Sequence, residues 1–466
     1  MQYTNTLALD EFFDRKVLTK YNTAGPRYTS YPTAIAFHED IKDEQIKTAN
    51  KRLIDSKNHQ NMSLYVHIPF CHQLCYYCGC NKIVTRHQDK ADKYLTYLEK
   101  EVDLVAPLYS AGIVTELHLG GGTPNFLTQT QLARLIDMLK TKFHFDTDAQ
   151  LSIEIDPRTV DEEYLTSAYK LGFRRLSIGV QDTDVEVQKA INRVQSTQHI
   201  ASLIKSARHL GYQSINLDLI YGLPHQTQTT FAKTLAEVEK MNPDRVSLFS
   251  YAHLPKMFAA QRKIKDDWLP NADAKFSLFR QAIQFMTNIG YDFVGMDHFA
   301  RPEDKLSIAQ REKSLYRNFQ GYTTGVANSC IGLGASSISS IENIYLQNAK
   351  DLKDYYQLLD QGKRPLVKGI QLSRDDEIRR DLIHQLMCNF ELDIRHFELK
   401  HQINFTEYFE QSLASLDTFI DDGLISLNQD KILIHQRGRL IVRNICMSFD
   451  QYLSQPMHQM RYSRVI

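Results

Sequence analysis

The sequence predicts an α/β protein built around a partial (βα)6 barrel similar to a TIM barrel, with an N-terminal extended arm and a mostly helical C-terminal domain. Six short apolar runs alternate with longer amphipathic stretches, which is typical of βα units and a parallel sheet. Polar or glycine-rich residues follow each run, as at the catalytic rim of parallel barrels. With 466 residues, the chain is long enough for a large core and roughly two or three domains.

The expected strands and helices follow from local patterns. The β-rich runs occupy 64–68, 116–120, 151–155, 174–180, 214–220 and 245–251. The amphipathic helical patterns between them include 129–143, 161–171, 196–211 and 228–241. Gly172 and Gly211 stand where a helix C-terminus favours a left-handed residue, so they mark the expected ends of two of these helices.

Each expected strand leads into residues that could bind a ligand or react. A cysteine-rich loop follows the first strand and the segment GGGTP (120–124) follows the second. The other four end in polar side chains, namely Glu154 and Asp156, Gln181 and Asp182, Asp218, and Tyr251 and His253. Because the carboxyl ends of barrel strands meet at one rim, these side chains are expected to lie close together.

The same residues also have purely structural interpretations. The glycines of GGGTP could form an ordinary tight turn. Glu154 and Asp218 could cap the helices that follow them. One of Tyr65 and His67, on the first strand, could be a core residue. The clustering of six strand ends favours a functional rim over these separate explanations.

The cysteine-rich loop CHQLCYYCGC (71–80) has the spacing Cys71-x3-Cys75-x2-Cys78-x-Cys80. A zinc site usually draws on two separated knuckles, and a redox Cys-x-x-Cys pair would leave Cys71 unused. An iron–sulfur cubane held by Cys71, Cys75 and Cys78 would leave one iron open for chemistry. The spacing favours the cubane and leaves the other two interpretations open.

The segments around the six units suggest three parts, 1–45 as an N-terminal arm, 46–370 as the catalytic barrel and its extension, and 371–466 as the C-terminal domain. Prolines in 24–34 predict an extended segment, in which Arg27 could bind a carboxylate. The glycine-rich stretches 295–306 and 316–339 are expected to be loops that line a site. After an amphipathic helix at 373–392 with Ser373 as N-cap, the order helix, turn, two strands and helix resembles a winged-helix unit.

Composition excludes several classes of function. The formal net charge is zero and the pI is about 7.3, so no global charge favours nucleic acid or acidic membranes. Basic residues in the winged-helix-like segment are not clustered, which favours a packing role over DNA binding. The start of the chain lacks the apolar core of a signal peptide, and no apolar run is long enough to span a membrane. We therefore expect a cytoplasmic protein in which clustered cysteines bind metal or do redox chemistry.

The cysteine spacing, with Tyr77 before Cys78, resembles that of the radical S-adenosylmethionine (SAM) superfamily. Further segments resemble the oxygen-independent coproporphyrinogen III oxidase (dehydrogenase) family within it, over nearly the whole chain. They include PRYTSYPTA, YVHIPFCHQLCYYCGC, HLGGGTPNFL, SIEIDPR, LSIGVQD, DLIYGLPHQT, GMDHFARP, RNFQGYTT and the terminal YSRVI. A related group of haem chaperones shares the first motifs but lacks a cysteine at position 80 and the N-terminal arm, and it is the alternative.

The resemblance implies an oxidoreductase of haem (porphyrin) biosynthesis. In this family a 5′-deoxyadenosyl radical, made from SAM at a 4Fe-4S cluster, initiates the oxidative decarboxylation of two propionates of coproporphyrinogen III, giving the vinyls of protoporphyrinogen IX. It also implies a low-potential electron donor, an electron acceptor and a monomeric protein, with no nucleic acid and no membrane span.

The resemblance also assigns site residues motif by motif. Cys71, Cys75 and Cys78 would hold the cluster, and Cys80 would not ligate iron. Two SAM molecules are implied: the first would contact Tyr65, Gly121, Glu154 and Ile338, and the second Tyr77, Gly122, Thr123, Gln181, Arg193, Asp218 and Ala252. The chain departs from the family at Ser329 and Cys330, near where relatives carry an acidic residue, which puts substrate contacts of this segment in question.

Overall fold

The computed structural model describes residues 14–55, 61–324 and 329–454. These form two compact units. The sheet unit comprises the described residues of Phe37–Gln281 and Gly325–Gln371, and the terminal unit those of Met1–Ala36, Ala282–Thr324 and Leu372–Ile466. The domain limits expected at 45/46 and 370/371 stay predictions. The YSRVI match and the first thirteen residues of the arm lie outside the described residues.

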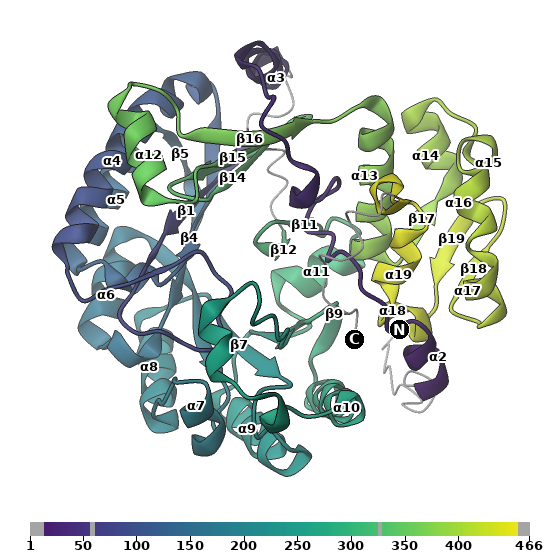
Figure 1. The fold of residues 1–466 in the computed structure, drawn as a ribbon, viewed down its shortest axis with the longest axis horizontal. Helices are drawn as coiled ribbons and strands as arrows, with labels where there is room; N and C mark the ends of the chain where they lie inside the picture. Colours follow the sequence, from purple (N-terminus) through teal and green to yellow (C-terminus); the bar gives the residue numbers. More distant parts are fainter. Residues whose placement is uncertain (1–13, 56–60, 325–328, 455–466) are drawn as a thin grey trace. The chain divides into compact units, whose positions relative to one another are not determined.

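The six expected strands are confirmed as neighbours in one sheet (Figure 1). They are parallel and follow the order of the chain: β1 (Asn61–Ile68), β4 (Ile113–Gly121), β5 (His144–Ile155), β6 (Phe173–Gln181), β7 (Ser214–Tyr221) and β8 (Arg245–Ser250). The partial barrel is thus confirmed, with all six carboxyl ends at one edge of the sheet.

Helices α4, α5, α6 and α8 cover the outer face of these strands, as Figure 1 shows. Thr128 begins α5 with a capping box, and Gly172 and Gly211 end α6 and α8 in left-handed conformation as expected. The helices are α3 (Asp43–Asp55), α4 (Asp89–Val105), α5 (Gln129–Lys142), α6 (Glu162–Leu171), α7 (Val185–Ala190), α8 (Thr197–Leu210), α9 (Gln228–Met241) and α12 (Leu352–Asp360), and α10 (Ala272–Asn288) begins in this unit.

Apolar and polar residues alternate along the strands, so the sheet has an apolar face and a polar face. Residues such as Val66, Leu117 and Ile153 are fully buried and build the core. The alternate positions are polar and contact one another across the strands through side-chain hydrogen bonds; they are His118, Ser152 and Glu154 on β4 and β5, and Ser177, Asn216, Asp218 and Ser247 on β6, β7 and β8. The alternating sequence of the strands therefore gives the sheet a polar inner face.

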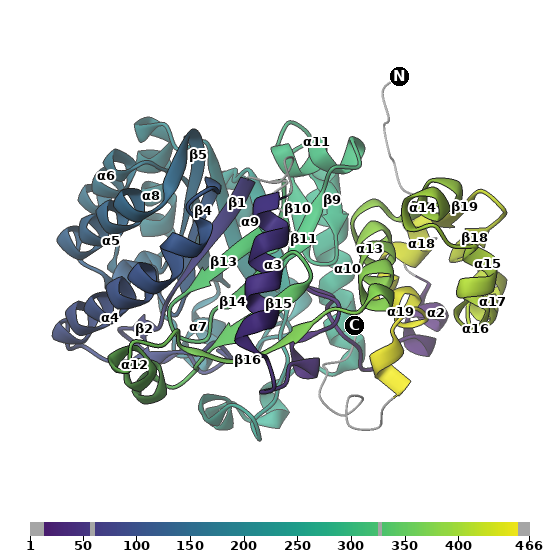
Figure 2. The same ribbon diagram turned by 90° about the horizontal axis from the view of Figure 1, so that it is seen from above.

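The glycine-rich stretch 316–339 was expected to form loops. This expectation is wrong for most of its described residues, and residues 325–328 lie outside the described part of the chain. The stretch contains β11 (Tyr316–Asn318), β12 (Gly321–Thr323), β13 (Ser329–Leu333) and the start of β14 (Ile338–Ile341). Strand β13 lies parallel to β1, and β14, β15 (Ile344–Asn348) and β16 (Leu366–Gln371) extend the sheet in antiparallel order, as Figure 2 shows. A Cβ on Gly332 would lie 2.6 Å from the carbonyl oxygen of Ile338, so the glycine permits close approach of the backbones.

The terminal unit confirms the expected C-terminal pattern. Ser373 caps α13 (Arg374–Asn389) with a capping box. Then follow α17 (Asp417–Asp421), the strands β18 (Ile425–Leu427) and β19 (Lys431–Ile434), and α19 (Val442–Met447). A third strand, β17 (Glu391–Asp393), completes this small sheet in the order β17-β19-β18.

The remaining elements of the terminal unit are short. They are α2 (Arg15–Lys20), β9 (Asp292–Gly295), β10 (His298–Ala300), α11 (Lys305–Arg311), α14 (Ile394–His401), α15 (Phe405–Tyr408), α16 (Glu410–Ala414) and α18 (Gln436–Arg439). Of the segment 24–34 that was expected to contain no helix, residues 24–33 agree with this expectation, whereas Ala34 begins a short 3-10 helix (Ala34–Ala36). Within the described residues, no helix is long and apolar enough to cross a membrane.

A buried carboxylate joins several elements of the sheet unit. Glu101 on α4 is only 1% exposed and accepts hydrogen bonds from the Tyr355 hydroxyl (2.5 Å), the Asn348 amide (2.6 Å) and the backbone N–H of Gly334 (2.8 Å). These partners are neutral, so burial dominates and raises the pKa of Glu101 to about 7. Glu101 therefore fixes the turn between β13 and β14.

We expect the stability of the protein to depend on the protonation of Glu101. Its pKa is higher in the folded protein than in the unfolded chain, so the folded state binds the proton more tightly and the free energy of unfolding falls as pH rises from about 4.5 to about 7. As the pH rises from 5 to 8, the free energy of unfolding of the wild type should fall by roughly 2–3 kcal/mol more than that of the Glu101→Gln protein. Urea unfolding followed by circular dichroism measures this.

The matched control is Glu99→Gln, because Glu99 lies on the same helix but is about half exposed in an ion pair with Arg134. That variant should keep the wild-type pH dependence. Equal pH dependence in the wild type and in Glu101→Gln would show that Glu101 does not titrate in this range.

Candidate active site at the carboxyl edge of the sheet

The cysteine loop leaves the carboxyl end of β1 and is held by both backbone and side chains. It begins at β2 (Phe70–Cys71), which pairs with β3 (Ile83–Val84). The backbone N–H of Tyr76 donates to the Ile191 carbonyl (2.9 Å), and the Asn192 amide donates to the Leu74 carbonyl (2.7 Å). The loop is thus fastened to the segment that follows α7.

The cysteines differ in exposure. Cys71 and Cys75 are buried, at 8% and 7% exposure, while Cys78 is half-buried and Cys80 is exposed. Burial raises the pKa of Cys71 to about 11, whereas hydrogen bonds from Cys80 lower the pKa of Cys78 to about 6. Within the described residues, no three His, Cys, Asp or Glu side chains lie close enough together to hold a single metal ion.

Each of the first three sulfurs accepts hydrogen bonds. The Thr123 hydroxyl donates to Cys71 Sγ (3.4 Å), and the backbone N–H of Cys80 donates to Cys78 Sγ (3.4 Å). Cys75 Sγ accepts from Arg193 Nη1 (3.5 Å) and Arg158 Nη2 (3.6 Å). Cysteine sulfurs are the ligands of iron–sulfur clusters, and hydrogen bonds to these sulfurs tune the cluster that they hold. The donor set therefore fits a cluster in which each cysteine binds a different iron.

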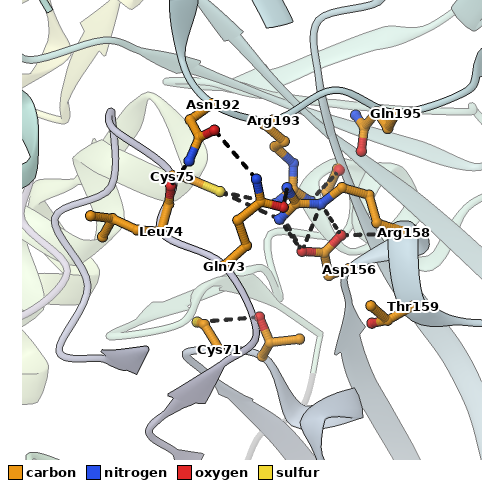
Figure 3. A network of polar contacts seen from close by, with 12 residues as sticks. Cys71, Gln73, Leu74, Cys75, Asp156, Arg158, Thr159, Asn192, Arg193 and Gln195 are labelled. Atoms are coloured by element: carbon orange, nitrogen blue, oxygen red, sulfur yellow. Dashed lines mark hydrogen bonds and ion pairs between the residues drawn. The ribbon is translucent and has the colours of Figure 1, made fainter. Parts of the chain in front are cut away.

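An arginine–aspartate network lies directly beside Cys75 (Figure 3). Asp156 accepts hydrogen bonds from Arg158 Nη2 (2.6 Å) and Arg193 Nη1 (3.1 Å). Burial alone would raise the pKa of Asp156, but the two guanidinium groups hold it below its usual range. Arg193 also donates to the Gly179 carbonyl (2.7 Å), and its Nε is buried and has no hydrogen-bond partner among the residues that the structure describes. This guanidinium therefore keeps one hydrogen-bond donor that is not used.

The glycines after β4 bring the backbone against the site. Gly121 has a φ of 116°, which favours glycine. A Cβ on Gly120 would lie 2.8 Å from Glu154 Oε1, and one on Gly122 would lie 2.8 Å from the Phe70 carbonyl oxygen. The Gly121 N–H points at Glu154 Oε2 (3.3 Å). These glycines therefore do more than form a turn, because side chains would separate β4 from the cysteine loop and from Glu154.

Two carboxylates lie on the polar face, and neither caps a helix. The following helices α6 and α9 are capped by Asp161 and Thr227, so the capping interpretation of Glu154 and Asp218 is wrong. Asp218 accepts hydrogen bonds from Ser177 and Asn216, of 3.0 and 2.9 Å. Burial and the negative charge of Glu154 together raise the pKa of Asp218 to about 7. A cation bound between the two carboxylates would relieve this repulsion.

The other expected site residues lie at the same edge. Tyr65 stacks on His118 and pairs in register with Gly332, whose neighbour on the adjoining strand is Ile338. Gln181 ends β6 with a φ of 66° and is buried. Tyr77 packs against the cluster that includes Tyr251, the residue before Ala252. All the expected site residues thus belong to the sheet unit, with Tyr77 and Ala252 in loops next to the others.

Sequence reasoning missed two participants. His118 links Ser152 to Glu154 through its two ring nitrogens, at 2.7 and 3.0 Å, and Arg158 bonds both Asp156 and Cys75. The sequence could have indicated His118, because it is a polar residue at an alternating position of an apolar strand. For Arg158 the signal was its place two residues after Asp156.

Ser329 and Cys330 lie away from the cysteine loop. They are buried in β13 and pair with Met62 and Ser63, at the amino end of β1. The cysteine loop follows the carboxyl end of β1. The departure from the family pattern therefore falls inside the sheet, outside the edge that carries the cysteines.

Comparisons with known proteins agree with one another and cover most of the chain. Residues 65–238 match the Radical SAM superfamily, and residues 372–441 match the HemN C-terminal domain. The oxygen-independent coproporphyrinogen III oxidases of Salmonella typhimurium strain LT2 and Escherichia coli strain K12 are 51% and 50% identical over 454 residues, covering 97% of this chain and 98% of each relative.

A solved structure has the same fold. Coproporphyrinogen III oxidase (HemN) from Escherichia coli, described as a radical SAM enzyme, superposes with a TM-score of 0.90 at 48% identity. The superposition covers 95% of this chain and 100% of that one.

Proposed function

Because the chain belongs to the oxygen-independent coproporphyrinogen III oxidase family of the radical SAM superfamily, we propose that it converts two propionates of coproporphyrinogen III to the vinyls of protoporphyrinogen IX. It is an oxidoreductase of haem biosynthesis. The observation that carries the proposal is the three-cysteine loop at the carboxyl end of β1, in a chain that matches these oxidases over 97% of its length.

Cys71, Cys75 and Cys78 would hold a 4Fe-4S cluster, the cofactor of this superfamily, and leave one iron free. When bound, the cluster and SAM would supply a 5′-deoxyadenosyl radical able to remove a hydrogen atom from a propionate β-carbon, and loss of CO2 with transfer of one electron to an acceptor would complete the oxidation. The protein's part is to position the reactants and exclude competing reactions. Arg193 and Arg158 beside Cys75 would offset the negative charge of the thiolates.

The first SAM would lie along Tyr65, Gly121, Glu154 and Ile338. The support is that Tyr65, Gly121 and Glu154 come from the neighbouring strands β1, β4 and β5, that only β13 separates β1 from Ile338 on β14, and that Gly121 and Glu154 are already in hydrogen-bond contact. The close glycine backbone leaves room for a ligand where a side chain would not.

We assign a second SAM to Tyr77, Gly122, Thr123, Gln181, Arg193, Asp218 and Ala252. Arg193 Nε is buried and finds no partner in the described part of the chain, and a SAM carboxylate would satisfy it. SAM carries positive charge on its sulfonium and ammonium groups, and the mutual repulsion of Asp218 and Glu154 favours such a cation. The low-potential donor, the electron acceptor, the monomeric state and the cytoplasmic location expected from the sequence also remain proposals.

Turnover of coproporphyrinogen III tests the proposed function. The protein, reconstituted with iron and sulfide without oxygen, should form protoporphyrinogen IX when SAM, a low-potential reductant and an electron acceptor are present. Chromatography of the oxidised porphyrins measures the product, and omission of SAM is the control. Stoichiometric haem binding without decarboxylation would instead support the haem chaperone.

A further inference from the structure

A histidine on the polar face of the sheet contacts two residues that are assigned to the first SAM, although it has no assigned role itself. His118 lies on β4, and its neighbours in register are Tyr65 on β1 and Ser152 on β5. Its ring stacks on the ring of Tyr65, with centroids 5.9 Å apart and an angle of 15° between the planes. Its Nε2 lies 3.0 Å from Glu154 Oε1. The strand register therefore places one imidazole against both Tyr65 and Glu154.

The direction of the hydrogen bond between His118 and Glu154 follows from the chemistry of its two ends. A carboxylate only accepts hydrogen bonds, so His118 Nε2 carries the hydrogen and donates it. The other ring nitrogen, Nδ1, lies 2.7 Å from Ser152 Oγ, and this hydroxyl oxygen is also 3.2 Å from the Leu117 carbonyl oxygen. A neutral imidazole accepts from the Ser152 hydroxyl, whereas a protonated one donates to it and leaves its hydrogen for Leu117. In both states Nε2 donates to Glu154.

The carboxylate of Glu154 is held at both of its oxygens. Oε1 accepts from His118, and the backbone N–H of Gly121 donates to Oε2 (3.3 Å). The Glu154 side chain is 42% exposed, so water can solvate its carboxylate and burial does not require these two donors. Their main effect is to restrict a side chain that would otherwise rotate freely. Each oxygen keeps a second lone pair, so the fixed carboxylate can still accept a hydrogen bond from a ligand.

We infer that His118 is a positioning residue for the first SAM, and that it acts by holding Glu154 in the orientation that accepts hydrogen bonds from this ligand. The inference rests on the proposed function, because it takes the first SAM to contact Glu154. The hydroxyl and ammonium groups of SAM are donors that a fixed carboxylate can bind. A carboxylate that is already ordered loses less conformational entropy when the ligand binds, so His118 raises the affinity for SAM through Glu154.

The test measures binding of SAM and needs no turnover. Reconstituted protein with an oxidised cluster is equilibrated with SAM without oxygen, and dialysis gives the dissociation constant. His118→Phe keeps an aromatic ring against Tyr65 but has no N–H for Glu154. It should bind the first SAM about tenfold more weakly, the scale of one hydrogen bond to a charged group.

Two further variants serve as rescue and control. His118→Gln should recover most of the affinity, because its side-chain amide N–H extends to about the same place as Nε2. His209→Phe is the matched control, since His209 is an exposed histidine in the last turn of α8, and this variant should bind SAM like the wild type.

A double-mutant cycle shows whether His118 acts through Glu154. Glu154→Ala should weaken binding of the first SAM, and His118→Phe added to Glu154→Ala should weaken it no further. If the second substitution instead caused the same loss in the presence and in the absence of Glu154, His118 would act independently of the carboxylate and the inference would be wrong.

Iron content and thermal unfolding separate positioning from a general loss of structure. In His118→Phe the Ser152 hydroxyl can still donate to the Leu117 carbonyl, and Glu154 keeps Gly121 and water as partners. The variant should therefore hold as much iron as the wild type and unfold at the same temperature. A loss of iron or a lower unfolding temperature in both His118→Phe and His118→Gln would assign His118 a structural role and overturn the inference.

The outcomes for the inference and for the proposed function are distinct. Wild-type affinity for SAM in His118→Phe, or no recovery of affinity in His118→Gln, would overturn the inference, while wild-type turnover of coproporphyrinogen III would leave the proposed function intact. If the wild type neither binds SAM nor converts coproporphyrinogen III, the proposed function and the inference both fall.

Discussion

Replacing Cys71, Cys75 or Cys78 with alanine is expected to abolish the visible absorbance of the cluster and all cleavage of SAM. Each sulfur is a separate ligand in the proposed site, and the two thiolates left in each variant are too few to hold the cluster. The measurement is iron and sulfide analysis after oxygen-free reconstitution, together with chromatography of 5′-deoxyadenosine. The loss of activity should be complete, since no other group of the site can make the radical.

Cys80→Ser is the matched variant, because Cys80 lies in the same loop but is exposed. Its backbone N–H, which donates to Cys78 Sγ, remains after the substitution. The variant should therefore keep its iron even if turnover falls. A Cys80→Ser protein that contains no iron after the same reconstitution would show that Cys80 is a ligand and that the assignment of three cysteines is wrong.

Asp218→Ala and Arg193→Ala are expected to keep the cluster and to bind one SAM, but to lose the decarboxylation of both propionates. We expect a fall of about 100-fold or more in turnover, the scale of a misplaced reactant. Product analysis and the stoichiometry of SAM binding on the reconstituted proteins measure the two effects. Normal conversion of coproporphyrinogen III with two SAM bound would show that both residues have only a structural role.

The control variants replace Asp244 or Arg208, which form an ion pair of 2.7 Å with each other. Asp244 also accepts a hydrogen bond from the backbone N–H of Ile215, which lies at the amino end of β7. Asp218 lies toward the carboxyl end of the same strand. Asp244→Ala and Arg208→Ala should change stability but leave SAM stoichiometry and product unchanged. Arg193→Lys adds a second check, because it keeps the charge beside Cys75 but cannot form the same paired contacts.

The parts of the fold that the sequence could predict are those set by neighbouring residues. The six parallel strands follow from runs of apolar residues, and the ends of α6 and α8 follow from Gly172 and Gly211. The rim could be predicted because strand direction places every carboxyl end at one edge of the sheet. The cysteine loop could be recognised from the spacing of its cysteines alone.

The parts that were missed depend on contacts between distant residues. Strand β13 lies beside β1, although more than 250 residues separate them, and its glycines looked like those of a loop. Glu101 stands on the buried face of α4 with Leu98 and Val105, but its partners come from residues 334–355. A helical pattern shows that a side chain will be buried, whereas it does not show which donors will surround it.

Transfer of deuterium from substrate to 5′-deoxyadenosine tests the central claim most directly. Coproporphyrinogen III labelled with deuterium at the propionate β-carbons is incubated without oxygen with the reconstituted protein, SAM and reductant, and the 5′-deoxyadenosine is analysed by mass spectrometry. We expect 5′-deoxyadenosine that carries one added deuterium, formed together with protoporphyrinogen IX, and neither product from the Cys75→Ala protein. Protoporphyrinogen IX accompanied by unlabelled 5′-deoxyadenosine, or by none, would contradict hydrogen abstraction by a SAM-derived radical.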